Sequence, residues 1–211
     1  MTKLTYTNRV LPLFSLSLVV ATVGVFIGYN YIGFISQPLV FIVLVITEFV
    51  ILFASFIARR AKNVSGVLVF AFAFVSGLVI SPLISTYIYS GSGSLVFQAF
   101  LLTTVVFGAL SYYAYVSGEN FSRLGGFLFV SLIGIILASL VNIFLRNTIV
   151  FLVVDILSII IFSGYVLYDT GKILNEYDDN DVYTAVLSLY IDFLNLFINI
   201  LELLGFLERK N

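Results

Sequence analysis

Residues 182–207 read VYTAVLSLYIDFLNLFINILELLGFL, and this stretch decides the fold. As a helix it would be roughly 39 Å long, which is enough to cross a hydrocarbon core of about 30 Å. The helix would not be apolar on every side, because polar residues recur at helical spacing along one stripe. The members of this polar stripe are Ser188, Asp192, Asn195, Asn199 and Glu202. A charge at the bilayer centre costs about 2.5 to 3.5 kcal/mol on insertion scales. We therefore expect the stripe to face other helices or water, and this helix to be the central one of a bundle.

The composition is that of an integral membrane protein. Of the 211 residues, 61% are hydrophobic and only 10% are charged, against roughly 25% charged in soluble domains. The chain has no His and no Cys, which excludes zinc sites of the usual type, disulfides, and Ser–His or Cys–His catalysis. A net charge of −1 gives no footprint for nucleic acid. We expect a lipid-embedded protein with no cofactor and no enzymatic activity.

Seven apolar segments of spanning length fill the chain, and the links between them are short. This pattern predicts an all-α, single-domain bundle over residues 1–211, with neighbouring helices antiparallel. The predicted spans are residues 10–29, 35–58, 66–89, 95–116, 124–145, 148–174 and 182–207.

The basic residues predict the orientation of the chain in the membrane. Seven would lie on one side of the bilayer, namely Lys3, Arg9, Arg59, Arg60, Lys62, Arg123 and Lys172. The other side would carry Arg146, Arg209 and Lys210. This asymmetry predicts a cytoplasmic amino terminus and a carboxy terminus outside. A hairpin-like final helix is the alternative.

Acidic residues within the spans are the candidate functional groups. Spans six and seven each contribute two, and in an antiparallel pair Asp169 would be level with Asp192, and Asp155 with Glu202. Two carboxylates in one site of low dielectric cannot both ionise cheaply, so they share a proton and titrate together. An Arg at the cytoplasmic end of span two, Arg59 or Arg60, would stabilise the anion. Asp169 and Asp192 with this Arg would form a pH-sensitive latch between span two and spans six and seven.

The other polar residues of the spans have simpler alternatives. Asp155 and Glu202 are expected on the ion pathway, nearer the predicted outer boundary. Side chains of this kind also reach for water at helix ends, which is the alternative. Asn195 and Asn199 are expected to form hydrogen bonds to neighbouring helices, while lying along the ion pathway.

At these residues the chain resembles the Bax inhibitor family, defined by the transmembrane Bax inhibitor motif, and its bacterial members most of all. The resemblance extends over the whole chain and is strongest at the end of span six and in span seven. Its motifs are Tyr165-Val-Leu-Tyr168-Asp169, Leu187-Ser-Leu-Tyr190-Ile-Asp192-Phe-Leu-Asn195-Leu-Phe197, Ala21-Thr-Val-Gly24, Phe74-Val-Ser-Gly77 with Ser81-Pro82, and Glu48 followed by Arg59-Arg60.

The resemblance implies six helices around a central seventh, in a bacterial-type plasma membrane, and a calcium leak with a di-aspartyl pH sensor. By match of motif, Asp169 and Asp192 would be the sensor and a weak calcium site, with Arg59 as the basic partner. Glu48 would be a carboxylate of the pore, and calcium and protons would be the transported species. The chain has Glu202 where relatives often have Arg. The properties of the outer mouth of the pore in those relatives are therefore not expected to hold for this chain.

Two other functions are compatible with carboxylates on adjacent spans. A proton-coupled calcium antiporter would use the same groups for exchange, although no inverted repeat is evident in the sequence. An intramembrane aspartyl protease would also place Tyr168-Asp169 in span six. However, Asp192 follows Tyr190-Ile191 rather than Gly-x-Gly, and no Pro-Ala-Leu stretch follows it.

Overall fold

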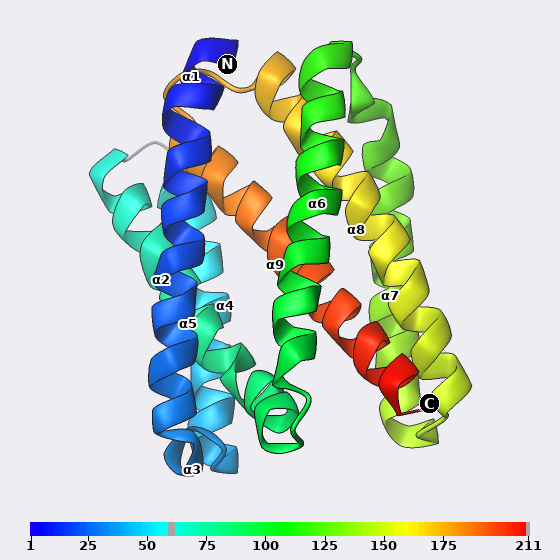
Figure 1. Ribbon diagram of the computed structural model, residues 1–211. Coiled ribbons are helices and arrows are strands. Elements are labelled where there is room, and N and C mark those ends of the chain that lie inside the picture. The colour runs from blue at the N-terminus through cyan, green and yellow to red at the C-terminus, as the bar shows by residue number, and fades with distance from the viewer. Residues whose placement is uncertain (59–61, 210–211) are drawn as a thin grey trace. The chain divides into compact units, whose positions relative to one another are not determined.

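The computed structural model describes residues 1–58 and 62–209, which form helices and no strand (Figure 1). Seven helices are long and apolar enough to cross a membrane, as the sequence predicted. The long helices are α2 (Leu11–Asn30), α4 (Pro38–Ile57), α5 (Lys62–Tyr89), α6 (Gly93–Ser117), α7 (Gly125–Leu145), α8 (Thr148–Glu176) and α9 (Val182–Glu208). The short elements are α1 (Lys3–Thr5), a π-helical turn η1 (Tyr6–Val10), α3 (Ile32–Ile35) and a 3₁₀ turn η3 (Phe121–Leu124). The all-α membrane fold is confirmed, and the central position of the last helix stays a prediction.

The chain divides into two compact units, and the division falls inside α9. Unit 1 comprises Met1–Gly93 with Glu176–Tyr190, and unit 2 comprises Ser94–Asn175 with Ile191–Asn211. The first part of α9 therefore packs within one unit and the remainder within the other. The expected single domain stays a prediction.

Unit 1 is built on the close approach of α2 to α5. A side chain at Gly24 would collide with the backbone carbonyl of Phe74, and one at Gly77 with that of Ala21. Glycine is needed at both positions because the two backbones are in contact there. The first part of α9 is attached to α5 by Tyr190, whose hydroxyl forms hydrogen bonds with Ser76 and with the carbonyl of Ala73.

Unit 2 combines α6, α7, α8 and the second part of α9. The ring of Phe193 on α9 meets the rings of Phe107 and Phe100 edge-on, with centroids 5.6 and 5.8 Å apart. Between α8 and α6, the Thr170 hydroxyl donates to that of Ser111 at 3.3 Å. In contrast, α7 buries only Leu128. The exposed apolar faces of α7 are suited to lipid, because a helix satisfies its own backbone hydrogen bonds.

The tight link between α7 and α8 fixes their antiparallel pairing. Arg146 ends α7 in the left-handed conformation, with φ 49°. The side-chain oxygen of Asn147 then accepts hydrogen bonds from the backbone N–H groups of Ile149 and Val150. This is the bonding of a helix N-cap, and it starts α8 at the predicted residue. The N-cap fixes the residue at which α8 begins, and thereby the positions of the carboxylates along this helix.

Candidate functional site

The structure brings Asp169 of α8 and Asp192 of α9 together inside unit 2. Their carboxyl groups lie within hydrogen-bonding reach of each other. Asp192 is only 3% exposed, and its Oδ2 atom has no hydrogen-bond partner among the described residues. Asp169 is half-buried. A hydrogen bond between two carboxyl groups requires a proton on one of them, so the two groups can bond directly only while one of them is protonated.

A cation beside this pair comes from a residue that sequence reasoning missed. Lys172 lies one turn after Asp169 on α8 and acts electrostatically on its carboxylate. Its ammonium donates to the Tyr168 hydroxyl at 3.1 Å and lies 5.2 Å from the centre of that ring. The i,i+3 spacing of Asp169 and Lys172 on one helix was the signal available in the sequence. The predicted basic partner, Arg59, lies outside the described residues.

Two tyrosines of α8 complete the surroundings of the pair. Tyr165 is close enough to interact electrostatically with both Asp169 and Asp192. Its ring meets that of Tyr168 edge-on, with centroids 6.3 Å apart. The Lys172 cation and the Tyr165 phenol thus lie close to the pair, and Tyr168 contacts both of these residues.

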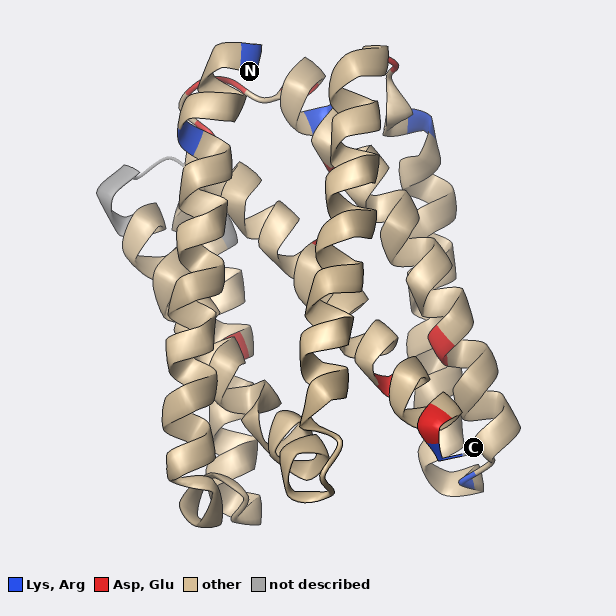
Figure 2. Cartoon of the chain, in the orientation of Figure 1, with Lys and Arg blue, Asp and Glu red and all other residues tan. Residues whose placement is uncertain are grey.

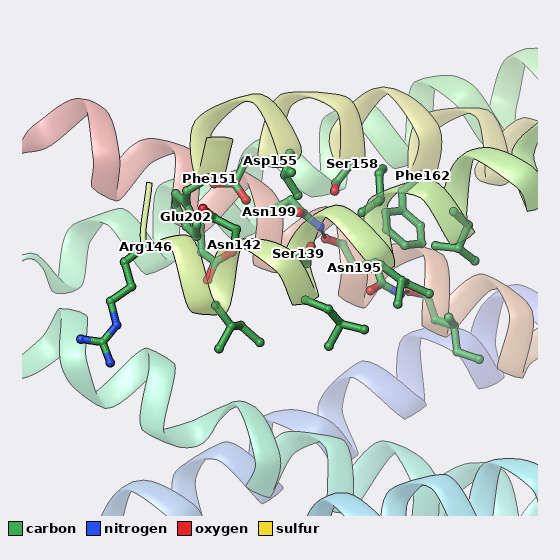
Figure 3. A pocket seen from close by; sticks show the side chains of 17 residues that line it. Ser139, Asn142, Arg146, Phe151, Asp155, Ser158, Phe162, Asn195, Asn199 and Glu202 are labelled. Atoms are coloured by element: carbon green, nitrogen blue, oxygen red, sulfur yellow. Dashed lines mark hydrogen bonds between the residues drawn. The ribbon is translucent and has the colours of Figure 1, made fainter. Parts of the chain in front are cut away.

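The second pair, Asp155 and Glu202, lies in a cavity of about 740 Å³ bounded by α7, α8 and α9 within unit 2. The two carboxylates are near enough to repel each other. Asp155 is 3% exposed and its Oδ2 has no partner in the part of the chain that is described. Figure 3 shows both acids beside Asn199, while the Arg146 side chain extends away from them. Asp155 and Glu202, predicted to lie at the same depth in the membrane, are therefore close together in the structure.

The roles expected for the two asparagines need correction. The side-chain N–H of Asn195 donates to the carbonyl of Ile191 at 2.8 Å, and that of Asn199 donates to the carbonyl of Asn195 at 2.6 Å. Both donors are therefore used within α9, not across to a neighbouring helix. The amide oxygens are acceptors, and both residues line the cavity.

Glu48 lies on α4 in unit 1, half-buried and close enough to Tyr190 to act on it electrostatically. Its expected place on the ion pathway stays a prediction. Figure 2 shows that most of each long helix carries no charge, so the few acids stand out. Within residues 1–58 and 62–209, three or more acidic residues do not gather into a metal-binding group. A cation bound by either acidic pair would have two carboxylates and neutral oxygens as its ligands.

Comparison with known proteins identifies the family. Residues 4–209 match the family model described as "Inhibitor of apoptosis-promoting Bax1". An uncharacterized protein of Campylobacter jejuni is 38% identical, over 94% of this chain and 87% of its own length. An uncharacterized membrane protein of Vibrio cholerae is 34% identical, over 97% and 92%. Bax inhibitor 1 of Schizosaccharomyces pombe is 34% identical, over 69% of this chain and 53% of its own length. The chain is therefore a multi-pass membrane protein that belongs to the Bax inhibitor family.

Proposed function

We propose that this protein is a pH-sensitive calcium leak channel, gated by the Asp169–Asp192 pair. The observation that carries the proposal is the meeting of these two carboxyl groups between α8 and α9 in the interior of unit 2. Buried carboxylates in a membrane protein are costly, and they mark ion pathways and proton relays far more often than packing.

The chemistry of the pair supports a gate. With one shared proton, the carboxyl groups attract each other and hold α8 against α9. When that proton leaves, two like charges remain in a site of low dielectric, where they repel each other and attract a cation. Protonation therefore changes both the packing of the two helices and the affinity of the site for cations.

Calcium suits the available ligands, because it binds six to eight oxygens. Two carboxylates without a third acidic ligand would bind it weakly, as a conducting site requires. The proposed orientation, with the amino terminus in the cytoplasm, follows from the distribution of Lys and Arg.

The test is calcium flux into proteoliposomes that enclose a calcium indicator, measured from pH 5 to pH 8. We expect wild-type flux to depend on pH, and Asp169→Asn and Asp192→Asn each to flatten that dependence. Asp178→Asn is the matched control, because Asp178 is an exposed aspartate outside the helices. Wild-type pH profiles in both pair variants would contradict the proposal.

The same vesicles distinguish a channel from a proton-coupled antiporter. A pH indicator in the lumen reports proton movement while calcium flows. A channel predicts no fixed ratio of protons to calcium. A constant ratio that disappears in Asp169→Asn would favour the antiporter.

A further inference from the structure

We propose that the cavity between α7, α8 and α9 is a divalent-cation site, with Asp155 and Glu202 as its charged ligands. It is distinct from the Asp169–Asp192 pair. This inference adds to the proposed calcium leak a place where the ion is bound. It rests on the proposed function only for the identity of the ion as calcium.

The charge balance of the cavity calls for a cation. Asp155 is 97% buried, its Oδ2 faces no hydrogen-bond donor within the described residues, and Glu202 adds a second carboxylate beside it. Burying such groups without compensation is strongly unfavourable. Arg146 does not supply the compensation, since its side chain points away from the two acids (Figure 3). A single divalent ion would neutralise both carboxylates.

The neutral groups around the acids form a set of oxygen ligands. The side-chain amides of Asn195 and Asn199 each donate one hydrogen bond to a backbone carbonyl of α9, and their oxygens can accept or bind a cation. The hydroxyls of Ser139 and Ser158 also line the cavity. Carboxylate, amide and hydroxyl oxygens are the ligands that hard divalent cations such as Ca²⁺ prefer.

The size of the cavity suits an ion that keeps part of its water. A volume of about 740 Å³ exceeds what a bare ion needs, whereas each water occupies about 30 Å³ in the liquid. A partly hydrated ion is bound weakly enough to leave. The apolar walls from α7 also admit an acyl chain, which is the competing occupant that the experiment must exclude.

The test measures Mn²⁺ binding by electron paramagnetic resonance, with protein in phosphatidylcholine nanodiscs and Ca²⁺ as competitor. The bilayer of the nanodisc lets an acyl chain compete for the cavity. We expect Asp155→Asn and Glu202→Gln each to weaken Mn²⁺ binding by at least about tenfold. Even the loss of a group that only hydrogen-bonds to a metal ligand has an effect of this size. Glu202→Asp, which retains the charge, should bind more tightly than Glu202→Gln. Asp178→Asn, on an exposed aspartate outside both pairs, should bind as wild type does.

Wild-type binding in both cavity variants would overturn the site, as would binding lost only in the variants of the Asp169–Asp192 pair. Failure of wild type to bind Mn²⁺ in nanodiscs would overturn it as well. A shift of the melting temperature by Ca²⁺, present in wild type and lost in Asp155→Asn, checks the result on folded protein. None of these measurements involves calcium flux. The experiments can therefore contradict the proposed gate and support the cation site, or contradict the cation site and support the gate.

Discussion

The two acidic pairs of unit 2 use the same two helices in different ways. Asp169 and Asp192 are in hydrogen-bonding reach of each other, with the Lys172 ammonium acting on Asp169. Asp155 and Glu202 repel each other across a cavity lined by amide and hydroxyl oxygens. The first pair can resolve its charge with a proton held between its members, whereas the second can resolve it with an ion. We therefore propose a proton site for the first pair and a cation site for the second, although both consist of two carboxyl groups.

The largest effect is expected from a substitution in unit 1, which contains neither pair, so its effect falls on the stability of the whole protein. Gly24→Ala places a methyl group against the backbone of α5, and overpacking of this kind costs about 1 to 3 kcal/mol. The yield of monodisperse protein and its melting temperature should both fall. Gly134→Ala is the control, because a Cβ at Gly134 in α7 meets no atom within 4 Å. Equal stability of the two variants would contradict the close contact between α2 and α5.

Glu202→Arg should separate the pairs most clearly. The new cation would neutralise Asp155 in the cavity, so Mn²⁺ binding should be lost while the flux still responds to pH. The measurement is Mn²⁺ binding and calcium flux on one preparation, with Glu208→Arg on the exposed end of α9 as the control. A variant that loses the pH response and keeps Mn²⁺ binding would reverse the two assignments.

Lys172→Met should change the first pair and spare the second. A neighbouring cation favours the ionised carboxylate, so removing it should move the midpoint of the flux response to higher pH by about one unit. Lys172→Arg keeps the charge and should remain nearer to wild type. Mn²⁺ binding in the cavity should be unaffected by either variant. An unmoved midpoint in Lys172→Met would show that another group sets the charge of the pair.

The smallest effect is expected at Asp179, outside both pairs. The Thr2 backbone N–H donates to its carboxylate at 2.8 Å, which lowers the pKa of Asp179 from its ordinary value of 3.8. Because the pKa is lowered by folding, the contact stabilises the amino-terminal segment above the ordinary pKa and is lost as pH falls through the lowered one. Asp179→Asn should speed hydrogen exchange in the first residues at neutral pH, with Asp178→Asn as control. Unchanged exchange would mean that the contact does not restrain the segment.

The helices were predictable because hydrophobic length alone specifies a membrane span. Local chemistry set the remaining boundaries. Pro38 starts α4 three residues later than expected, since proline is favoured in the first turn of a helix. At the amino terminus, helical structure begins at Lys3, where the Thr2 side chain accepts from the backbone N–H of Thr5. Short capping contacts of this kind leave a weak signal in a chain dominated by apolar residues.

The candidate site was predictable in part. The antiparallel register of α8 and α9 correctly brought together Asp169 with Asp192 and Asp155 with Glu202. The Lys172 cation was not predicted, because the resemblance implies a basic partner on span two, whereas Lys172 lies one turn after Asp169 on the same helix. The cavity could not be foreseen, since it depends on how loosely α7 packs against its neighbours, and periodicity in one helix carries no information about that.

The most direct test of the central claim is a double-mutant cycle on the first pair, with Asp169→Asn, Asp192→Asn and the double variant compared by the pH dependence of calcium flux. If the two carboxyl groups act as one proton-sharing unit, each single variant should flatten the response as fully as the double variant does. Lys172 and the cavity remain intact in all three proteins. Single variants that each keep half of the response, with effects that add in the double variant, would show that the two aspartates act independently and would contradict the account.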